Sequence, residues 1–284
     1  MIDVIKENLS YFELYVRIMM QKKYVVPEKI FYGKNKEQYF LYYEPEEVKS
    51  DIVIFYVHGG GWNAGSPDFF DFVGQRCAKE GYRFVSCGYR LSPRFKYPCQ
   101  IEDVNKCFKS SNEFLKGRNV NTNRLVVLGP SAGAHLGSIL TYDYYFDNII
   151  AFIGLGGLYS FDNSGLSVRM LLNMLFEKDY ERKAAEPVNR IRKSGIKALL
   201  IQSRHDGVIN FDCMLKMSKA LKDKGNSVEL YEVEDKQNTH SFYTAGCFML
   251  DREKKGMLKI EWFCHFFFWP ILFNLLNIKW FYLK

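Results

Sequence analysis

The sequence predicts an α/β fold in which a mostly parallel central sheet is flanked by helices, and three observations support this prediction. Short apolar runs alternate with amphipathic helical stretches along most of the chain, as parallel βαβ units require. The runs at 52–57, 125–128 and 149–155 are almost entirely apolar, which is typical of strands buried on both faces. Glycines gather directly after two of these runs, at 59–61 and 156–157, where loops at the sheet edge are expected.

Composition narrows the class of protein. A chain of 284 residues with 48% hydrophobic and 25% charged residues is typical of one large globular domain or two small ones. The net charge of +7 comes from scattered lysines without a basic block, which argues against a nucleic-acid partner. Seven cysteines without a CxxC spacing favour free thiols over disulfides or a metal site. With no apolar leader at the N-terminus, we expect a cytoplasmic protein.

The first predicted element is an amphipathic helix over residues 1 to about 24, with apolar residues at helical spacing. Two interpretations stand: packing on the domain, which we favour, and a lid over an active site. The later elements are predicted as strands at 30–32, 39–43, 52–57, 83–87, 125–128, 149–155, 197–202 and 228–233, and as helices at 69–79, 102–116, 136–140, 211–222 and 254–268.

At about 158–195 the alternation of strands and helices is interrupted, which predicts a cap inserted between two strands. Its apolar residues either line an acyl or aryl pocket or form an ordinary packed face; they are Met170, Leu171, Met174, Leu175 and Phe176. We therefore expect one domain over 1–268 with a small cap, followed by a hydrophobic tail at 269–284.

The chemistry centres on the Gly-x-Ser-x-Gly stretch at 129–133, which lies between an apolar strand and a helical pattern. That order predicts a sharp strand-to-helix turn carrying Ser131 as an exposed nucleophile. Because Gly129 and Gly133 have no Cβ, the strand and the helix can approach each other closely around it. The helix N-terminus favours the negative charge that develops during attack.

A second motif, His-Gly-Gly-Gly-Trp at 58–62, follows the strand at 52–57. Three consecutive glycines destabilise helices and strands, but they let backbone N–H groups point into a cavity. We expect the N–H groups of Gly60 and Gly61, together with that of Ala132 after the serine, to form an oxyanion hole. His58 is expected to form a hydrogen bond within this loop and not to act as a base.

A serine nucleophile needs a histidine to accept its proton and a carboxylate to orient the histidine. Asp206 and His240 follow predicted strands in the order acid, then histidine. Asp235 is a rival acid but lies in a charged loop only five residues before His240. His205 precedes the acid directly, and the pair can be interpreted either way as site residues.

Over roughly residues 30–268 the chain resembles the α/β-hydrolase fold, in the branch of hormone-sensitive-lipase-like esterases and small bacterial carboxylesterases. The resemblance depends on the motifs at 58–62 and 129–133, on Tyr-Arg-Leu-Ser-Pro at 89–93, and on Asp206 and His240. It implies hydrolysis of small carboxylic esters by a Ser131–His240–Asp206 triad without metal or cofactor. Two alternatives stay open: an arylformamidase-like amide hydrolase, and a binding protein on the same fold that has lost turnover.

The remaining histidines are not assigned to the site. We expect His135, in the helix after Ser131, to pack against the sheet, and His265 to lie on an aromatic-rich helix. The stretch 262–278 has no Asp, Glu, Lys or Arg over 17 residues, which reaches only the lower limit of a bilayer span. Aromatic residues and lysines follow it, so the tail is a candidate for peripheral contact with a membrane.

Overall fold

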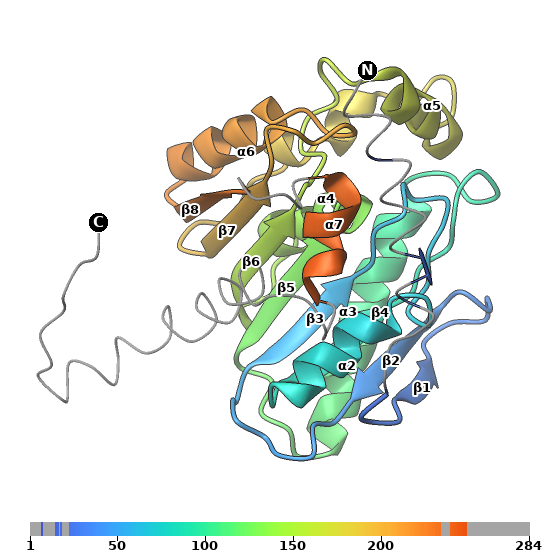
Figure 1. Cartoon of the computed structure of the whole chain (residues 1–284), viewed down its shortest axis with the longest axis vertical. Helices are drawn as coiled ribbons and strands as arrows, with labels where there is room; N and C mark the ends of the chain where they lie inside the picture. The colour runs from blue at the N-terminus through green and yellow to red at the C-terminus, as the bar shows by residue number, and fades with distance from the viewer. Residues whose placement is uncertain (1–6, 8–14, 17, 19–22, 234–238, 249–284) are drawn as a thin grey trace, which may run out of the picture.

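Eight strands form one sheet through the centre of the molecule (Figure 1). The computed structural model describes residues 7, 15, 16, 18, 23–233 and 239–248. The spatial strand order is β1-β2-β4-β3-β5-β6-β7-β8. The strands are β1 (Glu28–Phe31), β2 (Tyr39–Tyr43), β3 (Val53–Val57), β4 (Arg83–Cys87), β5 (Leu125–Pro130), β6 (Ile149–Leu155), β7 (Lys197–Gln202) and β8 (Ser227–Glu232). From β4 to β8 every neighbouring pair is parallel, while β1 and β2 form an antiparallel edge.

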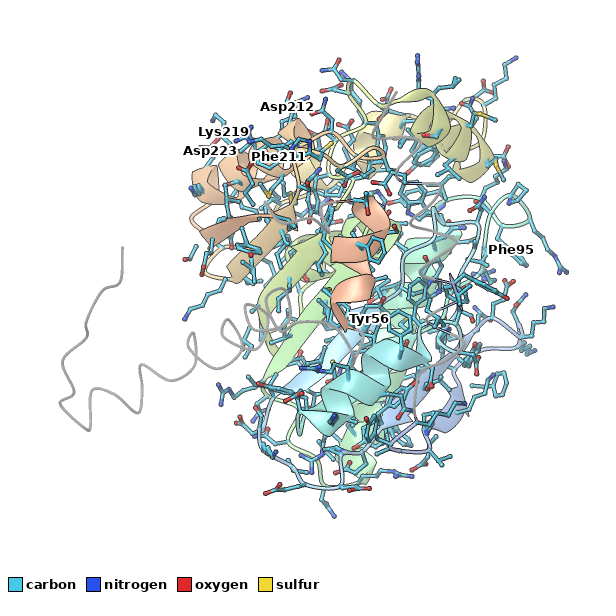
Figure 2. All side chains as sticks on the ribbon, viewed as in Figure 1. Tyr56, Phe95, Phe211, Asp212, Lys219 and Asp223 are labelled. Carbon is cyan, nitrogen blue, oxygen red and sulfur yellow. The ribbon has the colours of Figure 1, made fainter. Side chains whose placement is uncertain are left out.

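Helices cover both faces of this sheet. Side chains of α3, α4 and α6 pack on one face, and those of α2, α7 and η3 pack on the other. The helical elements are α2 (Asp71–Lys79), α3 (Cys99–Gly117), α4 (Ala132–Asp143), α5 (Leu166–Leu175), η1 (Arg182–Ala185), η2 (Pro187–Asn189), α6 (Asp212–Asp223), α7 (His240–Thr244) and η3 (Gly246–Phe248). The solvent face of α6 is charged, and Asp212, Lys219 and Asp223 extend along it in Figure 2.

The strand β3 shows why an uninterrupted apolar run becomes a central strand. Successive side chains point to opposite faces, so Phe55 packs edge-on against Phe108 of α3 while Tyr56 packs near Phe70 and Phe84 on the other face. All five β3 residues are buried. Burying one such side chain stabilises the fold by about 1.5–3 kcal/mol, and a polar residue in either set would interrupt one of the two cores.

The predicted α/β architecture with a mostly parallel sheet is confirmed. Strands β4 and β7 begin and end where the sequence places them. The sequence predicts no helix around His240, but α7 begins at this residue. A five-residue helix is too short to show an apolar period, and it is stabilised by contacts from distant parts of the chain that are described below.

Two predicted segments lie wholly outside the described residues: the helix at 254–268 and the tail at 269–284. The N-terminal segment is described only at Glu7, Tyr15, Val16 and Ile18 and from residue 23 onward. Within the portion of the chain that is described, no helix combines the length and apolar character needed to cross a membrane.

Candidate active site

Ser131 stands in a strained turn between β5 and α4. Its φ of 52° and ψ of −120° lie in a region that residues with a Cβ rarely occupy. Its N–H donates to the Leu155 carbonyl at 2.8 Å, which holds the turn against β6. A Cβ at Gly133 would lie 1.9 Å from the Val57 carbonyl oxygen, and one at Gly129 would lie 2.5 Å from the Gly133 backbone. Glycine at these two positions is therefore what lets helix and strand meet around the serine.

The loop after β3 places backbone N–H groups beside this turn. Gly60 and Gly61 have φ values of 107° and 59°, in the left-handed region that favours glycine. The Gly60 carbonyl accepts from Asn63 and Ala64, which closes the loop into a tight turn. Within the described ranges, the N–H groups of Gly60, Gly61 and Ala132 donate to no acceptor of the chain itself. Three such donors near a nucleophile are available to bind an oxyanion.

His58 holds this loop from behind. Its Nδ1 pairs with the Gly59 carbonyl oxygen at 2.7 Å, and its ring stacks on those of Tyr89 and Phe70. Burial lowers the pKa of His58 to about 4, so its imidazole is neutral at pH 7. The structure therefore places His58 as a structural group within the loop, where the sequence analysis expected it.

Asp206 and His240 come together at the carboxyl end of β7. The Nδ1 of His240 lies 2.7 Å from Oδ2 of Asp206, and both side chains are almost fully buried. Oδ1 of Asp206 accepts from the N–H groups of Val208 and Ile209 at 2.8 Å each. Burial lowers the pKa of His240, but the charge and hydrogen bond of Asp206 outweigh it, so the pKa ends above its ordinary value. A histidine held in this way by a carboxylate is suited to accept a proton.

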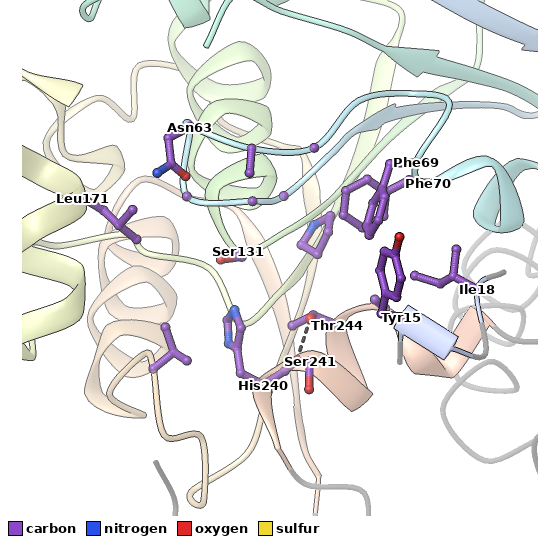
Figure 3. Close-up of a pocket in the computed structure, with 18 residues that line it drawn as sticks. Tyr15, Ile18, Asn63, Phe69, Phe70, Ser131, Leu171, His240, Ser241 and Thr244 are labelled. Atoms are coloured by element: carbon purple, nitrogen blue, oxygen red, sulfur yellow. Dashed lines mark hydrogen bonds between the residues drawn. The ribbon is translucent and has the colours of Figure 1, made fainter. Parts of the chain in front are cut away.

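One cavity of about 490 Å³ lies at Ser131 and His240 (Figure 3). Ser131, His240, Gly60 and Gly61 line it, and the His240 ring points towards Ser131. Asp206 lies behind His240 and does not line the cavity, as expected for a group that orients the ring. Ala132 is buried and is not among the lining residues either.

Aromatic and aliphatic side chains form the rest of the cavity wall. On one side of Ser131 lie Tyr15, Ile18, Phe69 and Phe70, and on the other lies Leu171 (Figure 3). The rings of Tyr15 and Phe69 stack with centroids 6.5 Å apart. This apolar wall is suited to the hydrocarbon part of a small substrate.

The N-terminal segment does more than pack on the domain. Tyr15 and Ile18 line the cavity, so the N-terminal segment contributes to the site, and the favoured interpretation of simple packing is incomplete. An amphipathic pattern does not reveal whether its apolar face covers a sheet or a cavity, because both surfaces are apolar.

The apolar cap residues divide between the two interpretations that the sequence left open. Leu171 lines the cavity. Leu175 and Phe176 are buried in the core, where Phe176 packs against Tyr97 and Tyr180. Met170 is exposed. Both interpretations therefore hold, each for different side chains of one short helix.

The other acids and histidines lie elsewhere. The His205 side chain is exposed, and its backbone N–H donates to Ser203. His135 is fully buried between Trp62, which donates to its Nδ1, and the Ala185 carbonyl at its Nε2. It therefore packs beneath the cap and the loop after β3. Asp235 and His265 lie outside the described residues.

Sequence reasoning missed two side chains that hold the Asp206–His240 pair. The Tyr243 hydroxyl donates to Oδ2 of Asp206, and Glu7 accepts from the N–H of His240. The three-residue spacing of His240 and Tyr243 on one helix is a local pattern that points to Tyr243, but the sequence predicts no helix there. Nothing local points to Glu7, which is separated from its partners by at least 200 residues. In the described part of the chain, no cluster of His, Cys, Asp or Glu is arranged to hold a metal ion.

Comparison with known proteins finds sequence relatives for the part of the chain around Ser131. The BD-FAE family model matches residues 41–154, a range that contains the Gly60–Gly61 loop and Ser131. Over 97 residues the chain is 39% identical to FAD-linked oxidoreductase pytB of Aspergillus terreus, covering 34% of this chain and 11% of that protein. Over 103 residues it is 30% identical to ethyl acetate hydrolase of Pseudomonas putida, covering 35% of this chain and 32% of that protein. The chain thus matches about a third or less of the length of these two relatives.

A solved structure extends the likeness to the whole fold. An inhibited esterase B of Lactobacillus rhamnosis superimposes with a TM-score of 0.75 at 16% identity, covering 97% of this chain and 99% of that one. At such identity the likeness concerns the fold, and it confirms the architecture expected from the sequence. The chain thus has the fold of this esterase, and its residues 41–154 are similar to the BD-FAE family model.

Proposed function

We propose that this protein hydrolyses small carboxylic esters through an acyl-enzyme formed on Ser131. One observation carries the proposal: His240, hydrogen-bonded to Asp206, faces the same apolar cavity as the strained Ser131. The ethyl acetate hydrolase relative supports the substrate class.

Ser131 Oγ attacks the ester carbonyl carbon while Nε2 of His240 accepts the hydroxyl proton. The carbonyl oxygen becomes an oxyanion and binds the N–H groups of Gly60, Gly61 and Ala132, each of which lowers the barrier by about 3 kcal/mol. Collapse of this intermediate breaks the bond to the alcohol oxygen, which takes the proton from His240. Water then attacks the acyl-serine, passes a proton to His240, and releases the acid and free Ser131.

Asp206 keeps His240 in the tautomer with the proton on Nδ1, so that Nε2 is free to accept. It also stabilises the imidazolium that forms during attack. The same machinery can cleave an activated amide, because the carbonyl carbon and the oxyanion are alike in both reactions. The aromatic and aliphatic wall of the cavity is suited to the aryl group of either substrate.

The first experiment measures hydrolysis of short-chain p-nitrophenyl esters by the purified full chain, with labelling of Ser131 by a fluorophosphonate. We expect turnover and a single labelled serine, and Ser131→Ala should lose both. A folded protein that shows neither turnover nor labelling would refute the proposal and favour a binding protein on this fold.

The same preparation separates ester from amide cleavage. We expect kcat/KM to be higher for phenyl acetate than for N-formyl-kynurenine. The opposite preference would replace the carboxylesterase with an arylformamidase-like enzyme that uses the same residues.

A further inference from the structure

The carboxylate of Glu7 is buried beside the acid–base pair. Only 3% of this residue is exposed. Its Oε1 accepts from the N–H of His240 at 2.5 Å and from the N–H of Gly207 at 3.2 Å. Its Oε2 lies 3.4 Å from the N–H of Ser241. A buried carboxylate is costly unless such donors satisfy it, and these three contacts help to hold it in place.

These donors come from one loop and one short helix that the reaction must hold together. Gly207 directly follows Asp206 in the loop between β7 and α6, while His240 begins α7. The hydrogen bond between the Asp206 and His240 side chains also joins this loop to α7. Glu7 therefore adds a second connection, made through backbone atoms, at the positions from which the acid and the base extend.

The charge of Glu7 also acts on His240. Burial raises the pKa of Glu7, and the hydrogen bond from the His240 N–H opposes this rise. At His240, burial lowers the pKa, while Asp206 and then Glu7 raise it. The other titratable groups described around the pair are Tyr243 on α7 and Cys213 on α6. Of the groups close to His240, Asp206 and Glu7 are the carboxylates.

We propose that Glu7 is a positioning residue for the ester hydrolysis proposed above, on which this inference rests. Its carboxylate fixes the backbone of His240 relative to that of Gly207, and its charge stabilises the imidazolium formed during attack. The same N-terminal segment supplies Tyr15 and Ile18 to the cavity wall (Figure 3). One segment thus provides part of the substrate cavity and one support of the general base.

The test compares Glu7→Gln with wild type in the full chain. The amide keeps the size of the side chain, removes its charge and directs an NH₂ group towards N–H donors. Hydrogen bonds to charged groups are strong enough that we expect kcat to fall about 10- to 100-fold, with KM changing less than about threefold. Without the Glu7 charge the pKa of His240 falls, so the acid limb of kcat/KM should move to lower pH. The matched control is Glu46→Gln, at an exposed glutamate between β2 and β3, which should match wild type in both measurements.

The outcomes separate this inference from the proposed function. If wild type hydrolyses no ester and is not labelled at Ser131, the proposed function fails and the inference fails with it. If wild type is active and Glu7→Gln keeps its kcat and acid limb, only the inference is overturned. A lower melting temperature with an unmoved acid limb and kcat would also overturn it, because Glu7 would then only stabilise the fold.

A second variant keeps the test decisive if Glu7→Gln does not fold. Glu7→Asp retains the charge but withdraws it by one methylene from the His240 and Gly207 N–H groups. We expect an acid limb close to that of wild type and a reduced kcat. A wild-type kcat in this variant would contradict the positioning role.

Discussion

The two halves of the candidate site are built in different ways. Ser131 and the Gly60–Gly61 loop follow the adjacent central strands β5 and β3, and backbone packing holds them, as the 1.9 Å approach of a Cβ at Gly133 to Val57 shows. Asp206 and His240 lie on the β7–α6 loop and on a five-residue helix. Side-chain hydrogen bonds from distant segments hold this half together.

This difference indicates which kind of substitution each half of the site tolerates. A change on the serine side that adds one carbon at Gly133 forces helix α4 away from strand β3 and acts on the whole fold. A change on the histidine side removes one hydrogen bond among several, so the fold survives while the orientation of the ring does not. Substitutions should therefore separate stability from activity according to the half in which they fall.

The largest expected effect on turnover is that of Asp206→Asn. The amide keeps an oxygen for the Val208 and Ile209 N–H groups but turns an NH₂ towards donors on His240 and Tyr243. We expect kcat to fall by about 10⁴-fold, as the equivalent change does in serine proteases, with little change in melting temperature. Steady-state kinetics and thermal unfolding of the same sample measure both quantities.

The control is Asp235→Asn, at the rival acid. We expect it to stay within a few-fold of wild type, because Asp206 occupies the place beside His240. The opposite ranking of the two variants would make His205–Asp206 a structural pair and would transfer the orienting role to Asp235.

On the serine side we predict that Gly133→Ala mainly destabilises the fold. Its Cβ would lie 1.9 Å from the Val57 carbonyl and 2.7 Å from that of His58, so backbone must move. Overpacking of this kind costs typically about 1–3 kcal/mol and occasionally more, and we expect a value at the upper end. Urea unfolding followed by circular dichroism measures it.

Gly117→Ala is the matched control at the end of α3. A Cβ there meets nothing within 4 Å, and alanine reduces the freedom of the unfolded chain. We expect stability equal to wild type or up to about 1 kcal/mol greater. Equal loss in both variants would show that the close approach at Gly133 does not hold the elbow.

The two halves of the candidate site also differ in how well they can be predicted from the sequence. The sheet and the serine half were predictable because their determinants are local: apolar runs of strand length, and glycines next to a serine. The motif at 129–133 specifies strand, turn and helix within five residues. Each determinant can be recognised without knowing which distant segment of the chain packs against it.

The histidine half was predictable only in part. Asp206 and His240 were assigned from their order after predicted strands, and the structure brings their side chains together. The helical start at His240, the Tyr243 hydroxyl and Glu7 were not foreseen. They depend on contacts between segments up to 234 residues apart, for which a single sequence contains no periodic pattern.

The smallest expected effect is a difference between the pH at which activity is half lost and the pH at which the protein is half unfolded. This difference is expected because the pKa values of the histidines in the two halves are shifted in opposite directions. Asp206 raises the pKa of His240 above its ordinary value despite burial, and only the neutral ring accepts the Ser131 proton. The acid limb of kcat/KM should therefore lie above pH 6.5. Protonation of His240 does not destabilise the fold, because a raised folded pKa adds stability at low pH and loses it as pH rises through that pKa.

On the serine side, burial lowers the pKa of His58 to about 4 and that of His135 to about 3. Between pH 6.5 and 4 the unfolded chain therefore binds protons that the folded chain does not, and stability falls as pH falls, by roughly 3 kcal/mol for His58 alone. Activity should thus be lost on acidification before the fold is. We would measure ester hydrolysis and circular dichroism on one sample from pH 8 to 4. Coincident midpoints would show that acid inactivation is unfolding and that the His240 half has no separate titration.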